Sequence, residues 1–109
     1  MSFDVLNPNK NDPWTIYVLD GCPFCKKVKN MFIERGYKLI NSNEKTSYIL
    51  KGDKYVIVHN INRNDKEQFK KKFIDILDKY SHYTFPIIFQ NDKFIGGLND
   101  FIEYYYNAF

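Results

Sequence analysis

An abrupt change of hydrophobic periodicity early in the chain constrains the fold more than any other feature. Trp14–Leu19 is a run of β-branched and aromatic residues with the length of a strand, and Asp20 and Gly21 end it. Pro23 suits the first turn of a helix, because the N–H that proline lacks would have no partner there. Apolar residues then recur at a spacing near 3.6 over roughly 23–35. The sequence therefore predicts a strand that runs directly into a helix.

Strand patterns follow this first helix, for which Gly36 is a suitable C-cap. The segments with strand patterns are Tyr37–Ile40, Ser47–Leu50 and Tyr55–Ile61, with a turn at 51–54 between the last two. We take Tyr55–Ile61 as the second core strand, because it runs directly into the next helix signal. Residues 37–54 are then expected to form an inserted hairpin or loop.

A helical pattern occupies the middle of the chain. Asn64 offers an N-cap, and Glu67 lies three residues further on as a capping-box partner. We expect a helix over roughly 65–80. Its apolar stripe would contain Phe69, Phe73, Ile76, Leu77 and Tyr80. Such a stripe is typical of a helix that packs one side against a core.

The C-terminal third predicts a hairpin followed by a helix. Ile87–Phe89 and Lys93–Ile95 are short strand patterns, and Gly96-Gly97 interrupts the chain after them. Asn99 can cap a last helix over roughly 100–108. The whole order, strand–helix, strand–helix, strand–strand–helix, predicts an α/β sandwich with a mixed sheet.

The composition indicates one domain, over 1–109, with a core of its own. Ten Phe, nine Tyr and one Trp bury large areas, and two cysteines are too few for a disulfide-stapled secreted domain. The first residues show no basic start followed by an apolar run, and no stretch has the length of a membrane span. We therefore expect a cytoplasmic protein.

The charge pattern gives little indication of a charged partner. The net charge is +3, and a mild excess of lysine is more typical of solubility than of a binding face. Lys70–Lys72 is a candidate anion patch, but it lies in a helical pattern where a solvated face is the ordinary interpretation. We expect a monomer with no nucleic-acid or membrane partner.

Cys22-Pro23-Phe24-Cys25 lies where the first strand gives way to the first helix. Cys22 is thereby placed at a helix N-terminus, where free N–H groups and the helix dipole stabilise a thiolate, and Lys26 adds positive charge behind it. Cys25 lies about one turn further on, so the two sulfur atoms can form a disulfide. Cys25 falls inside the helix and should be less exposed. Cys22 is therefore predicted to attack and Cys25 to resolve.

Two other interpretations of the cysteines are less favoured. Buried free cysteines are often inert core residues, but a proline between two of them at a strand–helix junction argues against that role. A zinc site would need two more ligands. The histidines of the chain, His59 and His82, are not spaced as a familiar ligand pair. No metal site is therefore predicted.

Three short motifs carry a family resemblance. They are Cys-Pro-Phe-Cys at 22–25, Thr-Phe-Pro at 84–86 and Ile-Gly-Gly-Leu-Asn-Asp at 95–100. In order and approximate spacing they resemble the dithiol motif, the Thr-Val-cis-Pro segment and the Gly-Gly turn of the glutaredoxin family, over roughly residues 14–104. The resemblance implies a thioredoxin-like, three-layer sandwich around a mixed four-stranded sheet, with an insertion between the first two helices.

The resemblance also implies a role for each matched residue. Cys22 would form a mixed disulfide with glutathione. Phe85, before a cis Pro86, would offer its backbone N–H and C=O to the cysteine of glutathione, strand against strand. The residues implied to bind glutathione are Thr84, Phe85, Pro86, Gly97, Asn99 and Asp100, and those implied to support the cysteine pair are Pro23, Phe24 and Lys26.

The residues that would bind the two ends of glutathione match the family pattern less well. Asn99 and Asp100 would hold its γ-glutamyl end, although helix capping alone explains them about equally well. The family usually has a lysine three residues before the first cysteine, which pairs with the glycine carboxylate of glutathione, and Leu19 stands there in this chain. A lysine of 26–27 or of 70–72 is a candidate to replace it.

The sequence therefore predicts a glutathione-dependent oxidoreductase that reduces protein–glutathione mixed disulfides and small disulfides. Glutathione would be a cosubstrate, and no tightly bound cofactor is expected. Two alternatives stay open. One is a thioredoxin-like dithiol reductase for a dedicated partner, although Gly21, not the Trp usual in thioredoxins, precedes Cys22. The other is a carrier of an iron–sulfur cluster ligated by cysteine and glutathione.

Overall fold

A mixed sheet with the strand order β2-β3-β4-β1-β5-β6 runs through the molecule. The structure, a computed structural model, describes residues 8–41 and 45–108. The strands are β1 (Trp14–Leu19), β2 (Lys38–Asn41), β3 (Thr46–Lys51), β4 (Lys54–Ile61), β5 (Ile87–Gln90) and β6 (Lys93–Gly96). The helices are α1 (Pro23–Glu34), α2 (Lys66–Lys72), α3 (Ile74–Tyr80) and α4 (Leu98–Ala108), with a 3₁₀ turn, η1 (Arg63–Asp65), before α2.

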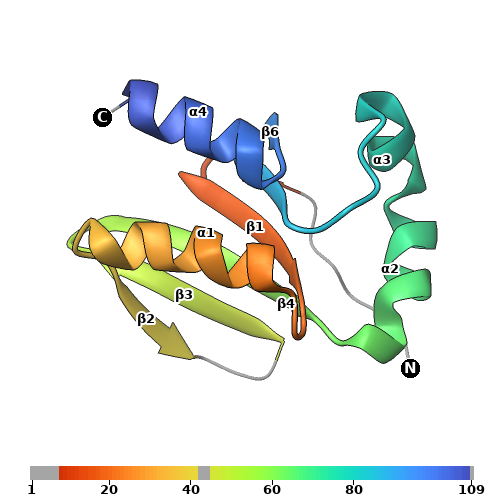
Figure 1. The fold of residues 1–109 in the computed structure, drawn as a ribbon, viewed down its shortest axis with the longest axis horizontal. Coiled ribbons are helices and arrows are strands. Elements are labelled where there is room, and N and C mark those ends of the chain that lie inside the picture. The colour runs from red at the N-terminus through yellow and green to blue at the C-terminus, as the bar shows by residue number, and fades with distance from the viewer. Residues whose placement is uncertain (1–7, 42–44, 109) are drawn as a thin grey trace.

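Helices cover both faces of the sheet, which gives the predicted three layers (Figure 1). On one face, the Trp14 ring meets Phe32 of α1 and Phe101 of α4 edge-on, at centroid distances of 5.6 and 5.4 Å. On the other face, Tyr17 packs against Phe69 and Phe73, at the α2–α3 junction. Successive side chains of a strand point to opposite faces, so β1 is buried on both and forms the centre of the core.

The four expected core strands are present as β4-β1-β5-β6, and the predicted insertion enlarges their sheet. β1 pairs in parallel with β4 and antiparallel with β5. Residues 38–41 and 46–51 form two further antiparallel strands that continue the sheet beyond β4. The prediction of Tyr55–Ile61 as the second core strand is confirmed, and the insertion makes the sheet six-stranded.

The helix predicted over 65–80 is divided into two. Phe73, with φ −97° and ψ 9°, ends α2 and precedes α3. Its ring packs 4.8 Å from Tyr17 and 4.6 Å from Phe69, so the apolar stripe still faces the sheet across the break. The rings of Phe69 and Phe73 thus both pack against Tyr17. No proline or glycine marks the break in the sequence.

Two predicted helix caps are corrected. Asn62, rather than Asn64, caps the 3₁₀ turn by accepting the N–H of Asn64 at 2.9 Å. Asn99 does not cap the last helix, because α4 already begins at Leu98 and Asn99 lies in its first turn. In both cases the helical segment begins earlier than the sequence pattern predicts.

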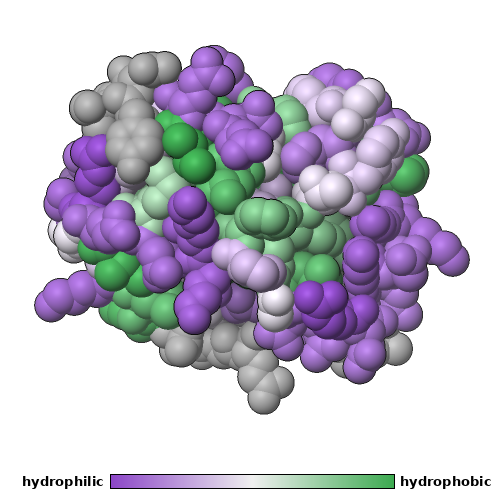
Figure 2. Space-filling view, viewed as in Figure 1, coloured by the Kyte–Doolittle hydropathy of each residue, from purple (hydrophilic) through white to green (hydrophobic). Residues whose placement is uncertain are grey.

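Within residues 8–41 and 45–108, no helix has both the length and the apolar character needed to cross a membrane. On the face drawn in Figure 2, hydrophobic surface gathers in the middle of the view, over the N-terminal end of α1 and the segment that leads into β5. Hydrophilic side chains surround this area. Phe24, at that end of α1, is 59% exposed.

Candidate active site

The thiol of Cys22 caps helix α1. Cys22 has extended backbone angles, its Sγ accepts the N–H of Cys25 at 3.4 Å, and Pro23 occupies the first helical position. The N–H of Cys22 itself donates to the carbonyl of Leu19 at 3.1 Å, which closes the turn from β1 into the helix. A side chain that accepts an orphan N–H at a helix start also lies where the helix dipole favours negative charge. The predicted position of Cys22 is confirmed.

Cys25 lies beneath Cys22 and is almost inaccessible. It is 2% exposed, whereas Cys22 is half-buried, and both are present as thiols. Burial raises the pKa of Cys25 to about 12, and its hydrogen bond with Cys22 contributes to the rise. The ammonium of Lys29, one turn further along α1, acts in the opposite direction. The two sulfur atoms therefore differ in access, as the sequence predicted, and burial disfavours the thiolate of Cys25.

The segment before β5 brings a backbone carbonyl to the exposed thiol. The Sγ of Cys22 lies 3.9 Å from the carbonyl oxygen of Phe85, within reach of a weak S–H···O hydrogen bond. The Phe85–Pro86 peptide bond is cis, as the family resemblance implied. The Phe85 side chain is buried against Phe69, with ring centroids 5.4 Å apart, while Thr84 is exposed. Residues 63 positions apart in the sequence thus form one side of the site.

The Gly-Gly turn leads from β6 into helix α4. Gly96 has φ +129°, and a Cβ there would collide with the carboxylate of Asp100, so glycine is required on both grounds. Asp100 Oδ2 accepts the N–H of Gly97 at 3.2 Å, which is the reciprocal half of a capping box. Asn99 is exposed in the first turn of the helix. Asp100 therefore has a structural role at the helix start.

His82 connects the Gly-Gly turn with the cis-proline segment. Its Nε2 lies 3.2 Å from the carbonyl oxygen of Pro86. Its ring also faces Gly97, where an added Cβ would lie 3.0 Å from Cε1. Sequence reasoning considered His82 only as a zinc ligand. No spacing signal could have revealed this contact, because Gly97 comes from a different element.

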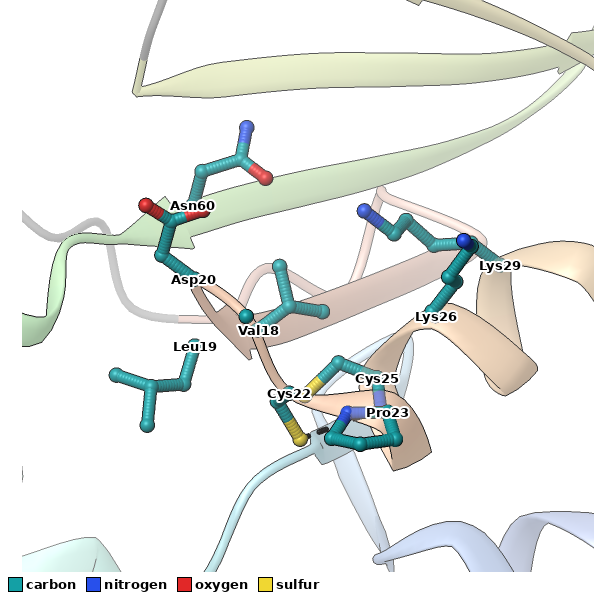
Figure 3. A pocket seen from close by; sticks show the side chains of 10 residues that line it. Val18, Leu19, Asp20, Cys22, Pro23, Cys25, Lys26, Lys29 and Asn60 are labelled. Carbon is teal, nitrogen blue, oxygen red and sulfur yellow. Dashed lines mark hydrogen bonds between the residues drawn. The ribbon is translucent and has the colours of Figure 1, made fainter.

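An open pocket of about 550 Å³ lies beside the two cysteines (Figure 3). Lys26 and Lys29 border it from α1, and Asp20 and Asn60 border it from the sheet side. Gly21, Cys22 and Cys25 also line the pocket. The predicted supporting residue Lys26 is thus beside the cysteine pair, in a pocket of mixed charge.

Arg63 is a positively charged residue near the cysteine pair that the sequence did not predict. It contacts the turn between β1 and α1. Arg63, in η1, donates from Nη2 to the carbonyl of Gly21 at 3.4 Å. Leu19, where the family usually has lysine, is 7% exposed and provides no charge. Of the lysines considered as replacements, Lys26 lines the same pocket as Leu19, Lys27 follows it on α1, and Lys70–Lys72 lie at the end of α2.

Among the described side chains, no group of three or more His, Cys, Asp and Glu residues is arranged to hold a metal ion. The two histidines make different contacts. His59 is buried and stacked on Tyr17, whereas His82 contacts Pro86.

Known proteins resemble the chain in sequence and in fold. No protein-family model matches the chain. A curated relative, named probable glutaredoxin, from Acanthamoeba polyphaga mimivirus is 28% identical over 103 residues, which are 85% of this chain and 79% of the relative.

Solved glutaredoxin structures share the fold. A dithiolic glutaredoxin of Trypanosoma brucei brucei superposes with a TM-score of 0.59 at 19% identity, covering 91% of this chain and 82% of that one. A buckwheat glutaredoxin–glutathione complex superposes with a TM-score of 0.60 at 17% identity, covering 91% and 73%. The chain therefore has the thioredoxin-like fold of the solved glutaredoxins, and it is similar in sequence to a curated protein named probable glutaredoxin.

Proposed function

We propose that this chain is a glutathione-dependent thiol–disulfide oxidoreductase that reduces protein–glutathione mixed disulfides and small disulfides through Cys22. One observation carries the proposal: the Cys22 sulfur caps a helix N-terminus and also lies 3.9 Å from the carbonyl of Phe85. The first property favours the thiolate, which is the nucleophile in thiol–disulfide exchange. The second puts the sulfur next to backbone groups that can pair with an extended peptide.

The reaction has two steps. The Cys22 thiolate attacks the glutathione sulfur of the mixed disulfide, a Cys22–glutathione disulfide forms, and the substrate protein leaves as a thiolate that takes up a proton. A thiolate from a second glutathione then attacks the glutathione sulfur on Cys22, releases oxidised glutathione and regenerates Cys22. Each mixed disulfide thus consumes one free glutathione, which leaves as oxidised glutathione together with the glutathione that was bound to the substrate.

Cys25 provides a second route for the release of glutathione from the Cys22–glutathione disulfide. It attacks the Cys22 sulfur, reduced glutathione leaves, and a Cys22–Cys25 disulfide remains for later reduction by two glutathione molecules. This route requires the Cys25 thiolate, and burial raises the pKa of Cys25 to about 12. A raised pKa slows the intramolecular route at neutral pH, whereas release by a second glutathione does not use the Cys25 thiolate.

Glutathione would lie across the two turns that meet at His82. The backbone of Phe85 would pair with its cysteine, beside the Cys22 sulfur. The ammonium of its γ-glutamyl end would reach Asp100, whose second carboxylate oxygen can accept while Oδ2 accepts from Gly97. Asn99 is exposed on the same first turn of α4. The solved buckwheat relative is described as a glutaredoxin–glutathione complex, which supports this ligand.

Arg63 is the residue we assign to the glycine carboxylate of glutathione. Its guanidinium lies against Gly21, one residue before Cys22, while Leu19 is buried. A guanidinium presents five N–H donors in a planar fork that matches a carboxylate. The bond to the Gly21 carbonyl engages one of these donors and holds the group at the entrance to the site.

A mixed-disulfide reduction assay with glutathione tests the proposal on the wild type and on both cysteine variants. Cys22→Ser should abolish the reaction, whereas Cys25→Ser should keep much of it, because a second glutathione can release the intermediate. Mass spectrometry of Cys25→Ser treated with oxidised glutathione should find one glutathione attached to Cys22. Full activity in Cys22→Ser would refute the proposal.

A further inference from the structure

His82 projects from a rigid base between two segments of the proposed glutathione site. Helix α3 ends with Ser81 in the left-handed conformation, at φ +52°, and the N–H of His82 donates to the carbonyl of Leu77 at 3.0 Å. This pattern is a common helix-terminating motif. The imidazole also meets the ring of Phe94 edge-on, at 5.4 Å. The backbone and one side of the ring are therefore fixed before any contact with the site.

The other two contacts of the ring reach the site itself. Nε2 lies 3.2 Å from the carbonyl oxygen of Pro86, so the tautomer with hydrogen on Nε2 donates to it. Cε1 faces the α-carbon of Gly97 so closely that an added Cβ would lie at 3.0 Å. Pro86 follows Phe85, which faces Cys22, and Gly97 precedes the helix that carries Asp100. One imidazole thus bridges the two segments.

We propose that His82 is a positioning residue that sets the separation between the Phe85–Pro86 segment and the Gly97–Asp100 turn. The inference rests on the proposed function, since it assigns these two segments to the two parts of one glutathione molecule. A ligand that contacts both segments binds best when their separation is already correct, because ordering them on binding would reduce affinity. His82 does not touch the reacting sulfur atoms, so it acts on binding and not on the exchange step.

The contact also explains why residue 97 is glycine. Gly97, unlike Gly96, does not have a positive φ, so its backbone is accessible to any residue. A Cβ would meet His82 at 3.0 Å and the Pro86 carbonyl oxygen at 3.6 Å. The first distance is tighter than ordinary van der Waals contact, and the second is not. Glycine at this position therefore makes room for the imidazole.

Steady-state kinetics with a glutathionylated peptide test the role of the donor. His82→Leu, which keeps apolar bulk without a donor, should raise KM about five- to tenfold and leave kcat within about twofold. His82→Gln, whose amide nitrogen can reach a similar position, should keep KM within about twofold of the wild type. Tyr83→Phe is the matched control, because it removes a hydroxyl on the same segment that donates to Asp78, outside the site. An unchanged KM in His82→Leu would overturn the proposal.

A double-mutant cycle tests the contact with Gly97. Gly97→Ala alone should raise KM, since the new methyl group displaces the ring. In the His82→Ala background the same substitution should have little further effect, because the obstructing ring is gone. Equal effects of Gly97→Ala in both backgrounds would show that the two residues are not coupled and would contradict the proposal.

A glutathione-free measurement separates this inference from the proposed function. Long-range ¹H–¹⁵N spectra of the wild type at alkaline pH should show His82 with its hydrogen on Nε2, and Gly97→Ala should shift its signals. A wild type that fails to use glutathione would refute the proposed function, whatever these spectra show. An active wild type with hydrogen on Nδ1 of His82 would refute the positioning role alone.

Discussion

Tyr17 and His59 face each other as register partners on the parallel strands β1 and β4, with rings stacked 5.0 Å apart at an angle of 16°. Both side chains are buried, and Tyr17 is 0% exposed. Burial lowers the pKa of His59, while Asp12 acts in the opposite direction. A titratable ring therefore lies in the layer between the sheet and helices α2 and α3.

The first prediction concerns stability in acid. Because the folded state lowers the pKa of His59, the unfolded chain binds a proton at this residue more readily, near the ordinary value of about 6.5. Stability should therefore be full above that pH and fall as pH decreases towards the folded-state pKa. Urea unfolding at pH 7.5 and pH 5.0 measures the change. In His59→Phe, which keeps a stacked ring, the decrease should be smaller, and an identical decrease in both proteins would exclude His59 as its source.

The second prediction concerns the route through Cys25. The pKa of Cys25 is raised to about 12, mainly by burial, so its thiolate fraction rises about tenfold for each pH unit below that value. Release of glutathione from a preformed Cys22–glutathione disulfide, without free glutathione, should therefore accelerate about a hundredfold between pH 7 and 9. Quenched-flow sampling measures the release. Cys25→Ser should show no such release, and a flat pH profile in the wild type would contradict the assignment.

The third prediction separates the two roles of Asp100. Asp100→Ala removes the acceptor for the Gly97 N–H and should cost about 1 kcal/mol of stability, in the range of lost helix caps. Asp100→Asn keeps an acceptor oxygen but loses the charge that would bind an ammonium. It should remain within about 0.5 kcal/mol of the wild type in denaturant unfolding and still raise KM for the glutathionylated peptide. An Asp100→Asn protein with wild-type KM would leave Asp100 as a cap alone.

The fourth prediction tests Arg63 as the carboxylate ligand. Arg63→Ala should raise KM for glutathionylated substrates about tenfold, the scale of one charge-assisted hydrogen bond, and Arg63→Lys should recover part of the loss. Lys54→Ala removes an exposed positive charge at the β3–β4 turn and serves as the control for net charge. A glutathione ester without the glycine carboxylate should be insensitive to Arg63→Ala. Equal loss with the ester would exclude carboxylate recognition.

Local patterns predicted the elements that carry the cysteine pair, because their signals are contained in a few neighbouring residues. The strand at 14–19 and the proline start of α1 both depend on periodicity and turn chemistry within the segment itself. The cis bond before Pro86 came from the family resemblance, not from the residues. The roles of the proposed glutathione-binding residues stay predictions.

Contacts between distant segments were beyond the reach of sequence patterns. At the break between α2 and α3, Phe73 packs against the Tyr17 ring of β1, and the sequence pattern on either side of Phe73 is that of one helix. Arg63 meets Gly21 across 42 positions, and His82 meets Gly97 only after β5 and β6 turn back. A single residue that is placed by tertiary packing leaves no period in the sequence.

The inserted strands also change how the sheet meets its surroundings. Without them, the eight residues of β4 would form an outer strand with a row of unpaired N–H and C=O groups, which other chains can pair with. With them, the outer strands are β2 and β6, each of four residues. Both begin with an exposed lysine, Lys38 and Lys93, a residue type that discourages strand addition. The insertion therefore covers the long edge of β4 and leaves two short outer strands, while β1 keeps its place between β4 and β5.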